Sequence, residues 1–302
     1  MKKLRIGTRS SKLALWQATM VQKLLVEKGF ESELIPIQST GDVTQDIPLH
    51  QIGGVGLFTK ALDDALLNNE IDCAVHSCKD LPSTLNTELI IAAHLEREDP
   101  RDIVVCKQNA ETFISENINA TIATGSVRRK AQWLSKFPNH TLVGLRGNVD
   151  TRLQKLKDND WHGAIFAYAG LKRLNIQPEK YFFPEWMVPA PAQGVIVVVC
   201  NKNDITTTEK IATINHKSTS ITTTVERDFL RLMDGGCIAP IGALAAIRQE
   251  KIYFNIAVHN SNGTKEVALH FEEAVVRYAE LGNRAYEAAK ASGAVEIISS
   301  LR

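Results

Sequence analysis

The chain has 302 residues, of which 44% are hydrophobic and 23% charged, as expected for a soluble globular protein with two or three domains. Its formal net charge is +1, which excludes an overall field that would attract nucleic acid or a membrane, so any anion site must come from local clustering of Arg and Lys. Five cysteines without paired metal-binding spacing predict a reduced, cytoplasmic setting and no metal site. No stretch has the length and apolarity of a membrane span, and Arg5, Arg9 and Lys12 interrupt any signal-peptide core.

The first 38 residues have the pattern of a strand, a helix and a second strand. Strands are predicted over residues 4–8 and 33–38. An apolar stripe over residues 12–27 predicts the helix between them, which Ser10 or Ser11 can cap. This order of elements predicts a parallel sheet in an α/β fold.

Two charged positions in this part follow predicted strands. Arg9 lies between the first strand and its helix, and a helix N-terminus favours an anion. Asp80, preceded by Lys79, follows an apolar run at residues 71–75 and precedes Leu-Pro. Because ligands of open α/β sheets bind outside the carboxyl ends of strands, Asp80 is placed where a catalytic carboxylate can lie. The alternatives are a solvated loop charge at Arg9 and a surface ion pair at Asp80.

Between these elements, residues 39–57 form a long predicted loop. It contains glycines at positions 53, 54 and 56, which permit unusual backbone dihedral angles. Loops of this length are usually functional or disordered, so we interpret the segment as a lid over a site. It is not a Walker A loop, because no Gly-Lys-Ser/Thr follows. A helix over residues 59–68 leads to the strand before Asp80.

A second α/β set follows a strand at residues 88–95 and a polar crossover at residues 96–102. Its predicted strands each end just before basic residues. The strands cover residues 121–124, 141–145 and 163–167, and the basic residues after them are Arg128 and Arg129, Arg146 with Arg152, and Lys172 with Arg173. Ends of parallel strands point to one crevice, so these side chains, with Arg9, predict an anion-selective cleft. The alternative is that each is a charge on a solvated helix face.

The rest of the chain predicts a return crossing and a third domain. A crossing at residues 185–193 leads to an apolar strand at residues 195–200, which is expected to return to the first lobe. Two crossings, the other near residues 95–101, describe a double hinge that permits two lobes to close around a ligand. We therefore assign residues 1–95 and 194–214 to lobe 1, 100–188 to lobe 2 and 217–302 to a small α+β domain.

A helical region is predicted over residues 205–234 and extends into that third domain. Cys237 follows in a Gly-Gly-Cys loop, where backbone freedom can expose the thiol. The ordinary alternative is a buried loop cysteine. Strands are predicted at about residues 243–248, 251–259 and 265–271, followed by a helix from about residue 274 to 291.

Taken together, the order and spacing of these motifs resemble the porphobilinogen deaminase (hydroxymethylbilane synthase) family over essentially the whole chain. The resemblance is carried by Arg5–Ser11, Leu13–Ala18, Val75–Pro82, Glu96–Asp102, Arg128-Arg129, Leu145–Val149, Thr151–Leu153, Ala169–Leu174, Gly235–Cys237 and Pro240–Gly242. It implies two lobes like those of periplasmic binding proteins, with a third domain that bears the cofactor. It also implies a monomeric transferase of tetrapyrrole and haem biosynthesis.

The resemblance implies a specific chemistry. Four porphobilinogen molecules are condensed in turn, each with loss of ammonia, onto a dipyrromethane cofactor bound through a thioether to Cys237, and water releases the linear hydroxymethylbilane. Asp80 would stabilise the cationic intermediate left when ammonia departs. Cofactor contacts are implied for Lys79, Thr124, Ser126, Arg128, Arg129 and Arg146. Substrate contacts are implied for Arg9, Ser11, Gln17, Phe58, Arg146, Arg152 and Arg173.

The chain departs from the family pattern at four places. Val55 stands where a lysine is usual in the predicted lid, and Gly125 stands where a serine precedes Ser126. Ala192 replaces the first glycine of Gly-Gln-Gly, and Val199 replaces a common glutamate. None of these changes touches Asp80 or Cys237, so the chemistry is expected to be retained.

Two other functions are alternatives to the synthase. A non-catalytic two-lobed protein that binds a small polyanion has the same arginines, but it has no need of Asp80 or of Cys237 in its loop. Nucleic-acid binding is disfavoured by the net charge of +1 and the lack of a basic surface with interspersed aromatic residues.

Overall fold

The computed structural model describes residues 3–38, 59–114, 118–233 and 239–301. This part of the chain divides into two compact units, Met1–Glu98 with Gly194–Ile221 and Asp99–Gln193 with Thr222–Arg302. Residues 222–302 thus share a unit with residues 99–193, and the division into three domains stays a prediction. Within the described ranges, no helix has the length and apolarity needed to cross a membrane.

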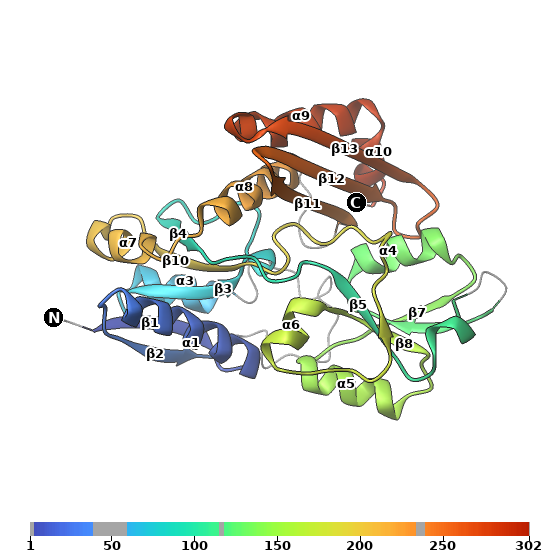
Figure 1. Cartoon of the computed structure of the whole chain (residues 1–302), viewed down its shortest axis with the longest axis horizontal. Coiled ribbons are helices and arrows are strands. Elements are labelled where there is room, and N and C mark those ends of the chain that lie inside the picture. The colour runs from blue at the N-terminus through green and yellow to red at the C-terminus, as the bar shows by residue number, and fades with distance from the viewer. Residues whose placement is uncertain (1–2, 39–58, 115–117, 234–238, 302) are drawn as a thin grey trace. The chain divides into compact units, whose positions relative to one another are not determined.

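Unit 1 is built on one five-stranded sheet in the order β2-β1-β3-β10-β4 (Figure 1). The strands are β1 (Leu4–Arg9), β2 (Ser32–Ile37), β3 (Cys73–Ser77), β4 (Leu89–His94) and β10 (Ile196–Asn201). The prediction of parallel pairing is right for β1 with β2 and β3. It is wrong for β10, which is antiparallel to both β3 and β4. The reason is that β10 enters the sheet from the return crossing and not through a β-α-β connection.

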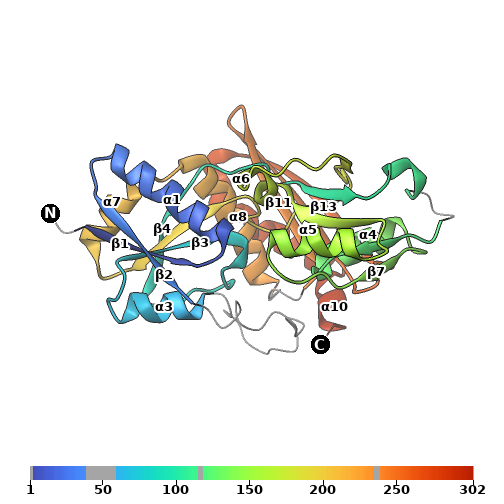
Figure 2. The same cartoon turned by 90° about the horizontal axis from the view of Figure 1, so that it is seen from below.

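Helices cover both faces of this sheet (Figure 2). Alternation along β1 explains the arrangement: Ile6 lies in the core with Val21 and Leu25 of α1 (Lys12–Glu27), whereas Gly7 faces the opposite side. An added Cβ at Gly7 would lie 3.0 Å from Leu62 of α3 (Lys60–Leu67), so glycine lets α3 approach closely.

The predicted single helical region at residues 205–234 is two helices in the structure. They are α7 (Ile205–Ala212) and α8 (Lys217–Leu232). The break is stabilised because the backbone N–H of His216 donates to His94 O at 2.7 Å, and the His216 ring then accepts the Thr219 N–H at 3.3 Å.

The first sheet of unit 2 has the order β7-β6-β8-β5-β9. Its strands are β5 (Asp102–Cys106), β6 (Thr121–Ala123), β7 (Thr141–Val143), β8 (Gly163–Ala167) and β9 (Tyr181–Phe182). β6 is parallel to β7 and β8, and β5 is antiparallel to β8 and β9. The pattern of directions is the same as in unit 1, with β5 in the place of β10. The buried strand β5 is absent from the sequence prediction, because its short apolar run directly follows the polar crossover.

Helices follow β6, β7 and β8 of this sheet, and a smaller α+β part completes the unit. The helices are α4 (Val127–Lys136), α5 (Val149–Asp158) and α6 (Tyr168–Arg173). The smaller part contains antiparallel β11 (Ile241–Arg248), β12 (Lys251–His259) and β13 (Glu266–Ala274), with α9 (Tyr278–Ala291) and α10 (Ala294–Ser299). The predicted fold class, two α/β lobes with a small α+β C-terminal part, is therefore confirmed.

Candidate active site

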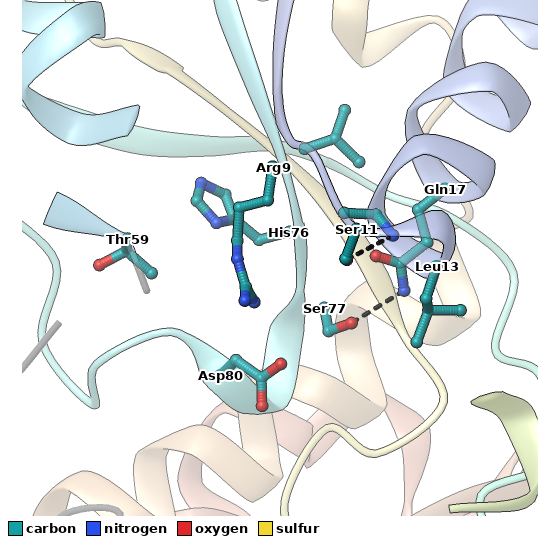
Figure 3. Close-up of a pocket in the computed structure, with 10 residues that line it drawn as sticks. Arg9, Ser11, Leu13, Gln17, Thr59, His76, Ser77 and Asp80 are labelled. Atoms are coloured by element: carbon teal, nitrogen blue, oxygen red, sulfur yellow. Dashed lines mark hydrogen bonds between the residues drawn. The ribbon is translucent and has the colours of Figure 1, made fainter. Parts of the chain in front are cut away.

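A pocket in unit 1 lies at the carboxyl ends of β1 and β3 (Figure 3). The structure brings together four of the residues predicted from the sequence: Arg9, Ser11, Gln17 and Asp80. It adds others that were not predicted, and these are Leu13, Ala14, Thr59, Val75, His76 and Ser77. Lys79, predicted beside Asp80, is half-buried in the same turn and does not line the pocket.

The N-terminus of α1 opens into this pocket because side chains fix the turn after β1. Thr8 is fully buried, and its Oγ1 donates a hydrogen bond to Ala14 O at 3.1 Å. Ser11 is the N-cap, and its Oγ accepts the Ala14 N–H at 3.3 Å. The helix end carries partial positive charge, so with Arg9 it favours an anionic group in the pocket.

Asp80 is held by a turn that follows β3 directly. The 3-10 turn Cys78–Asp80 is anchored by the Cys78 N–H, which donates to Val195 O at 2.9 Å, and closed by the Leu81 N–H, which donates to Cys78 O at 3.2 Å. Cys78 is buried whereas Asp80 is exposed. Gln17 Nε2 donates to Ser77 Oγ at 2.8 Å and ties α1 to this strand end. The Asp80 carboxylate is thus on a fixed backbone yet accessible to a ligand.

Two titratable groups, the buried His76 and the half-buried Asp63, lie around the pocket on the α3 side. His76 is 6% exposed, and burial together with the Arg9 charge lowers its pKa to about 4. Thr59, the N-cap of α3, lines the pocket and hydrogen-bonds to the Asp63 carboxyl. Burial raises the pKa of Asp63 to about 6. His76 is therefore neutral at pH 7, so Arg9 supplies positive charge here and His76 does not.

Unit 2 has the corresponding edge at the carboxyl ends of β6, β7 and β8, which are mutually parallel. The segments that follow β6 and β7 touch one another. The Thr124 N–H donates to Val143 O at 2.8 Å, and an added Cβ at Gly125 would lie 2.5 Å from Leu145 O. The serine usual in the family therefore does not fit this spacing without a shift of the neighbouring segment. Ser126 is the N-cap of α4, and its Oγ accepts the Arg129 N–H at 3.4 Å.

Arg128 and Arg129, predicted to bind ligand carboxylates, both contact Asp102 at the start of β5. Asp102 Oδ2 accepts from Arg128 Nη1 at 2.8 Å, and Oδ1 accepts from Arg129 Nη2 at 2.8 Å and Nε at 3.0 Å. Gln193 Nε2 adds a fourth hydrogen bond to Oδ1 at 2.9 Å. Burial alone would raise the pKa of Asp102, but the two guanidinium charges outweigh it and hold the pKa far below its usual range.

This buried cluster still carries one net positive charge, from two guanidinium groups and one carboxylate. Arg128 Nε is buried and has no hydrogen-bond partner among the described residues. A further carboxylate would offset the charge of the cluster and give this atom a partner. The net positive charge is compatible with a ligand that carries carboxylates, and contact of Arg128 and Arg129 with such a ligand stays a prediction.

The other predicted residues are placed less uniformly. Arg146 is half-buried, and burial lowers the pKa of its guanidinium group. Thr124 is connected to β7 through its backbone N–H. Arg152, in α5, donates from Nε to Gly147 O of the preceding loop at 2.8 Å, and Arg173 is buried at the end of α6. Cys237, Phe58 and Val55 lie outside the described residues.

Comparison with known proteins finds two models of one protein family along the chain. The family model "Porphobilinogen deaminase, dipyromethane cofactor binding domain" matches residues 4–209, and "Porphobilinogen deaminase, C-terminal domain" matches residues 220–291. The chain belongs to the porphobilinogen deaminase family. This membership confirms the predicted family, the transferase class, the place in tetrapyrrole synthesis and the dipyrromethane cofactor.

Individual relatives agree along nearly their full length. The porphobilinogen deaminase of Campylobacter hominis is 40% identical over 99% of this chain and 98% of the relative. A probable porphobilinogen deaminase of Methanocaldococcus jannaschii is 40% identical over 93% of this chain and 97% of its own. Among solved structures, a substrate binding domain of a putative amino acid ABC transporter from Streptococcus pneumoniae covers 70% of this chain and 91% of its own, at 12% identity and a TM-score of 0.45.

Proposed function

We propose that this chain condenses four porphobilinogen molecules onto a dipyrromethane bound to Cys237, with loss of one ammonia per step, and releases hydroxymethylbilane by hydrolysis. The observation that carries the residue-level proposal is the unit 1 pocket, where the exposed Asp80 carboxylate lies with Arg9 and the N-terminus of α1. The pocket combines the Arg9 cation, which can bind substrate carboxylates, with the Asp80 anion, which can stabilise positive charge that develops on the substrate.

In the proposed chemistry, Asp80 acts at the carbon–nitrogen bond of the substrate's aminomethyl group. The amine leaves as ammonia with the bonding electron pair, which leaves positive charge on the pyrrole. An anionic carboxylate near that ring stabilises the transition state. The same carboxylate assists the proton transfers to the leaving amine and from the carbon that forms the new bond.

The basic residues hold and orient carboxylates. In unit 1 we assign this task to Arg9, with Ser11, Gln17 and Lys79 as supporting polar groups. In unit 2 we assign it to the positively charged Asp102 cluster and its neighbours, which are Thr124, Ser126, Arg128, Arg129, Arg146, Arg152 and Arg173. When bound, the dipyrromethane supplies the nucleophilic pyrrole carbon to which the first porphobilinogen is joined. We further propose that Phe58 contacts pyrrole rings, that the protein is a cytoplasmic monomer, and that it binds neither nucleic acid nor membranes.

The test replaces Asp80 with Ala and with Asn, and compares both with Asp64→Ala on the exposed side of α3. Because Asp80 is exposed, all three variants are expected to unfold at the wild-type urea midpoint. Both Asp80 variants should lose turnover by about 100-fold or more, as expected for loss of a group that moves protons and stabilises charge, whereas Asp64→Ala should not. Near-normal bilane formation by Asp80→Asn would refute this assignment.

The anchor is tested separately. Cys237→Ser should prevent attachment of the dipyrromethane, as read by intact mass. Detection of the same adduct on another residue would show that Cys237 is the wrong anchor.

A further inference from the structure

His76 is a buried polar group whose hydrogen bonding is incomplete. It lines the unit 1 pocket and is 6% exposed, and its Nε2 has no hydrogen-bond partner among the described residues. A buried polar atom without a partner costs about 1–3 kcal/mol, and such exceptions in a native fold call for an explanation. An apolar residue at this position would avoid that cost.

The position of the ring is fixed by the sheet. His76 pairs with Val197 of β10, and β3 lies between β1 and β10. Alternation along β3 sends Cys73 and Val75 to the core beneath α1, so His76 faces the other side, where Figure 3 shows it beside Arg9 and toward Thr59. The imidazole is therefore held rigidly next to the cation that favours an anion in the pocket.

The His76 imidazole is neutral at pH 7. Burial and the Arg9 charge keep it so, since they lower its pKa to about 4. The titratable groups around it are Arg9 from β1, Asp80 from the turn after β3, and Asp63 behind Thr59 on α3. A neutral imidazole can donate one N–H to a carboxylate without adding positive charge. A second cation here would oppose the positive charge that forms on the substrate next to Asp80.

We propose that His76 is a positioning residue whose neutral imidazole donates a hydrogen bond from Nε2 to the substrate carboxylate that Arg9 draws into the Asp80 pocket. This inference rests on the proposed function, because it takes the ligand to be a carboxylate-bearing pyrrole. In the free protein the unpartnered nitrogen destabilises the fold. In the complex the carboxylate supplies the missing partner.

The stability test uses the full-length protein with His76→Leu, His76→Phe and His76→Gln. The two apolar variants remove the unpartnered atom, and Gln places an amide N–H near the position of Nε2. We expect at least one apolar variant to unfold at the same urea concentration as wild type or a higher one. If both apolar variants unfold at a clearly lower concentration, the imidazole is a structural group and the proposal is overturned.

The binding test uses the Asp80→Ala background, so that porphobilinogen binds without turnover, and follows binding by calorimetry. Loss of a hydrogen bond to a charged group should weaken binding about 10- to 100-fold in the apolar His76 variants, and Gln should restore most of it. Equal affinity with and without His76 would overturn the inference. Absence of porphobilinogen binding in the Asp80→Ala parent would instead count against the proposed function, so the two failures are distinguishable.

Discussion

Replacement of Asp102 with Asn should destabilise unit 2 severely. Asp102 accepts four hydrogen bonds, three from the guanidinium groups of Arg128 and Arg129 and one from Gln193. All of these side chains are buried. Asparagine keeps one oxygen acceptor and turns an NH₂ group toward the donors, so the cluster changes from one net positive charge to two.

The magnitude follows from the burial of the ion pairs. Removal of one partner from a buried, hydrogen-bonded ion pair costs about 3–5 kcal/mol, because the remaining charge stays buried without compensation. The adjacent pair of Asp99 with Arg101, at 2.7 Å, has half of the Arg101 side chain exposed. Asp99→Asn is therefore the matched control from the same crossing, with an expected loss of at most about 1 kcal/mol.

The assay is urea unfolding followed by tryptophan fluorescence, because Trp133 is fully buried in the core of unit 2. The pH dependence gives a second check. The pKa of Asp102 is lower in the folded state than its value of about 3.9 in the unfolded chain. The stability that Asp102 contributes is therefore fully present above about pH 3.9 and is lost only as the pH falls toward the folded-state pKa. The difference between wild type and Asp102→Asn should therefore be constant from pH 8 to pH 5. A loss below 1 kcal/mol, equal to that of the control, would refute the reasoning.

Two further predictions concern strain and pH. Ala192 has a φ of +61°, a left-handed conformation that is unfavourable for a residue with a Cβ. Ala192→Gly should therefore raise the free energy of unfolding by about 0.5–1 kcal/mol, and a lower urea midpoint would contradict this. Asp63 has its pKa raised to about 6, so the folded state loses stability as pH rises from about 4 through 6 and the carboxyl ionises. Asp63→Asn should therefore stabilise the protein at pH 8 by at most about 3 kcal/mol and leave it unchanged at pH 4, and urea midpoints that shift equally at both pH values would be inconsistent with this cause.

The elements that the sequence predicts well are those with strong local signals. A cap at Ser10 or Ser11 and the apolar stripe after it predict the bounds of α1, and Ser11 is the cap in the structure. The basic residues after three strands correctly indicate one sheet edge. Strand β5 is different, because its four apolar residues follow the polar segment of residues 96–102, which has the composition of a solvated linker. Nothing local shows that Asp102 ends the linker and begins a buried strand.

The contents of the site depend still more on tertiary contacts. Asp102 lies 26 and 27 residues from Arg128 and Arg129, and only the packing of β5 against α4 makes it their partner. Sequence reasoning therefore expected these arginines to contact ligand carboxylates and had no sign of an internal one. His76 was missed because a lone histidine in an apolar strand is usually a core residue. The feature that could have indicated His76 is its position one residue before the end of β3. Strand alternation turns it to the face opposite Ser77, which contacts Gln17.

The proposed function requires that the chain carry a covalent primer and extend it with porphobilinogen. It is tested most directly by the intact mass of protein made in a host that synthesises porphobilinogen, before and after addition of the substrate. We predict a mass above that of the sequence by one dipyrromethane, located at Cys237, and then a ladder of species that differ by successive pyrrole units. An unmodified mass both before and after substrate would contradict the account.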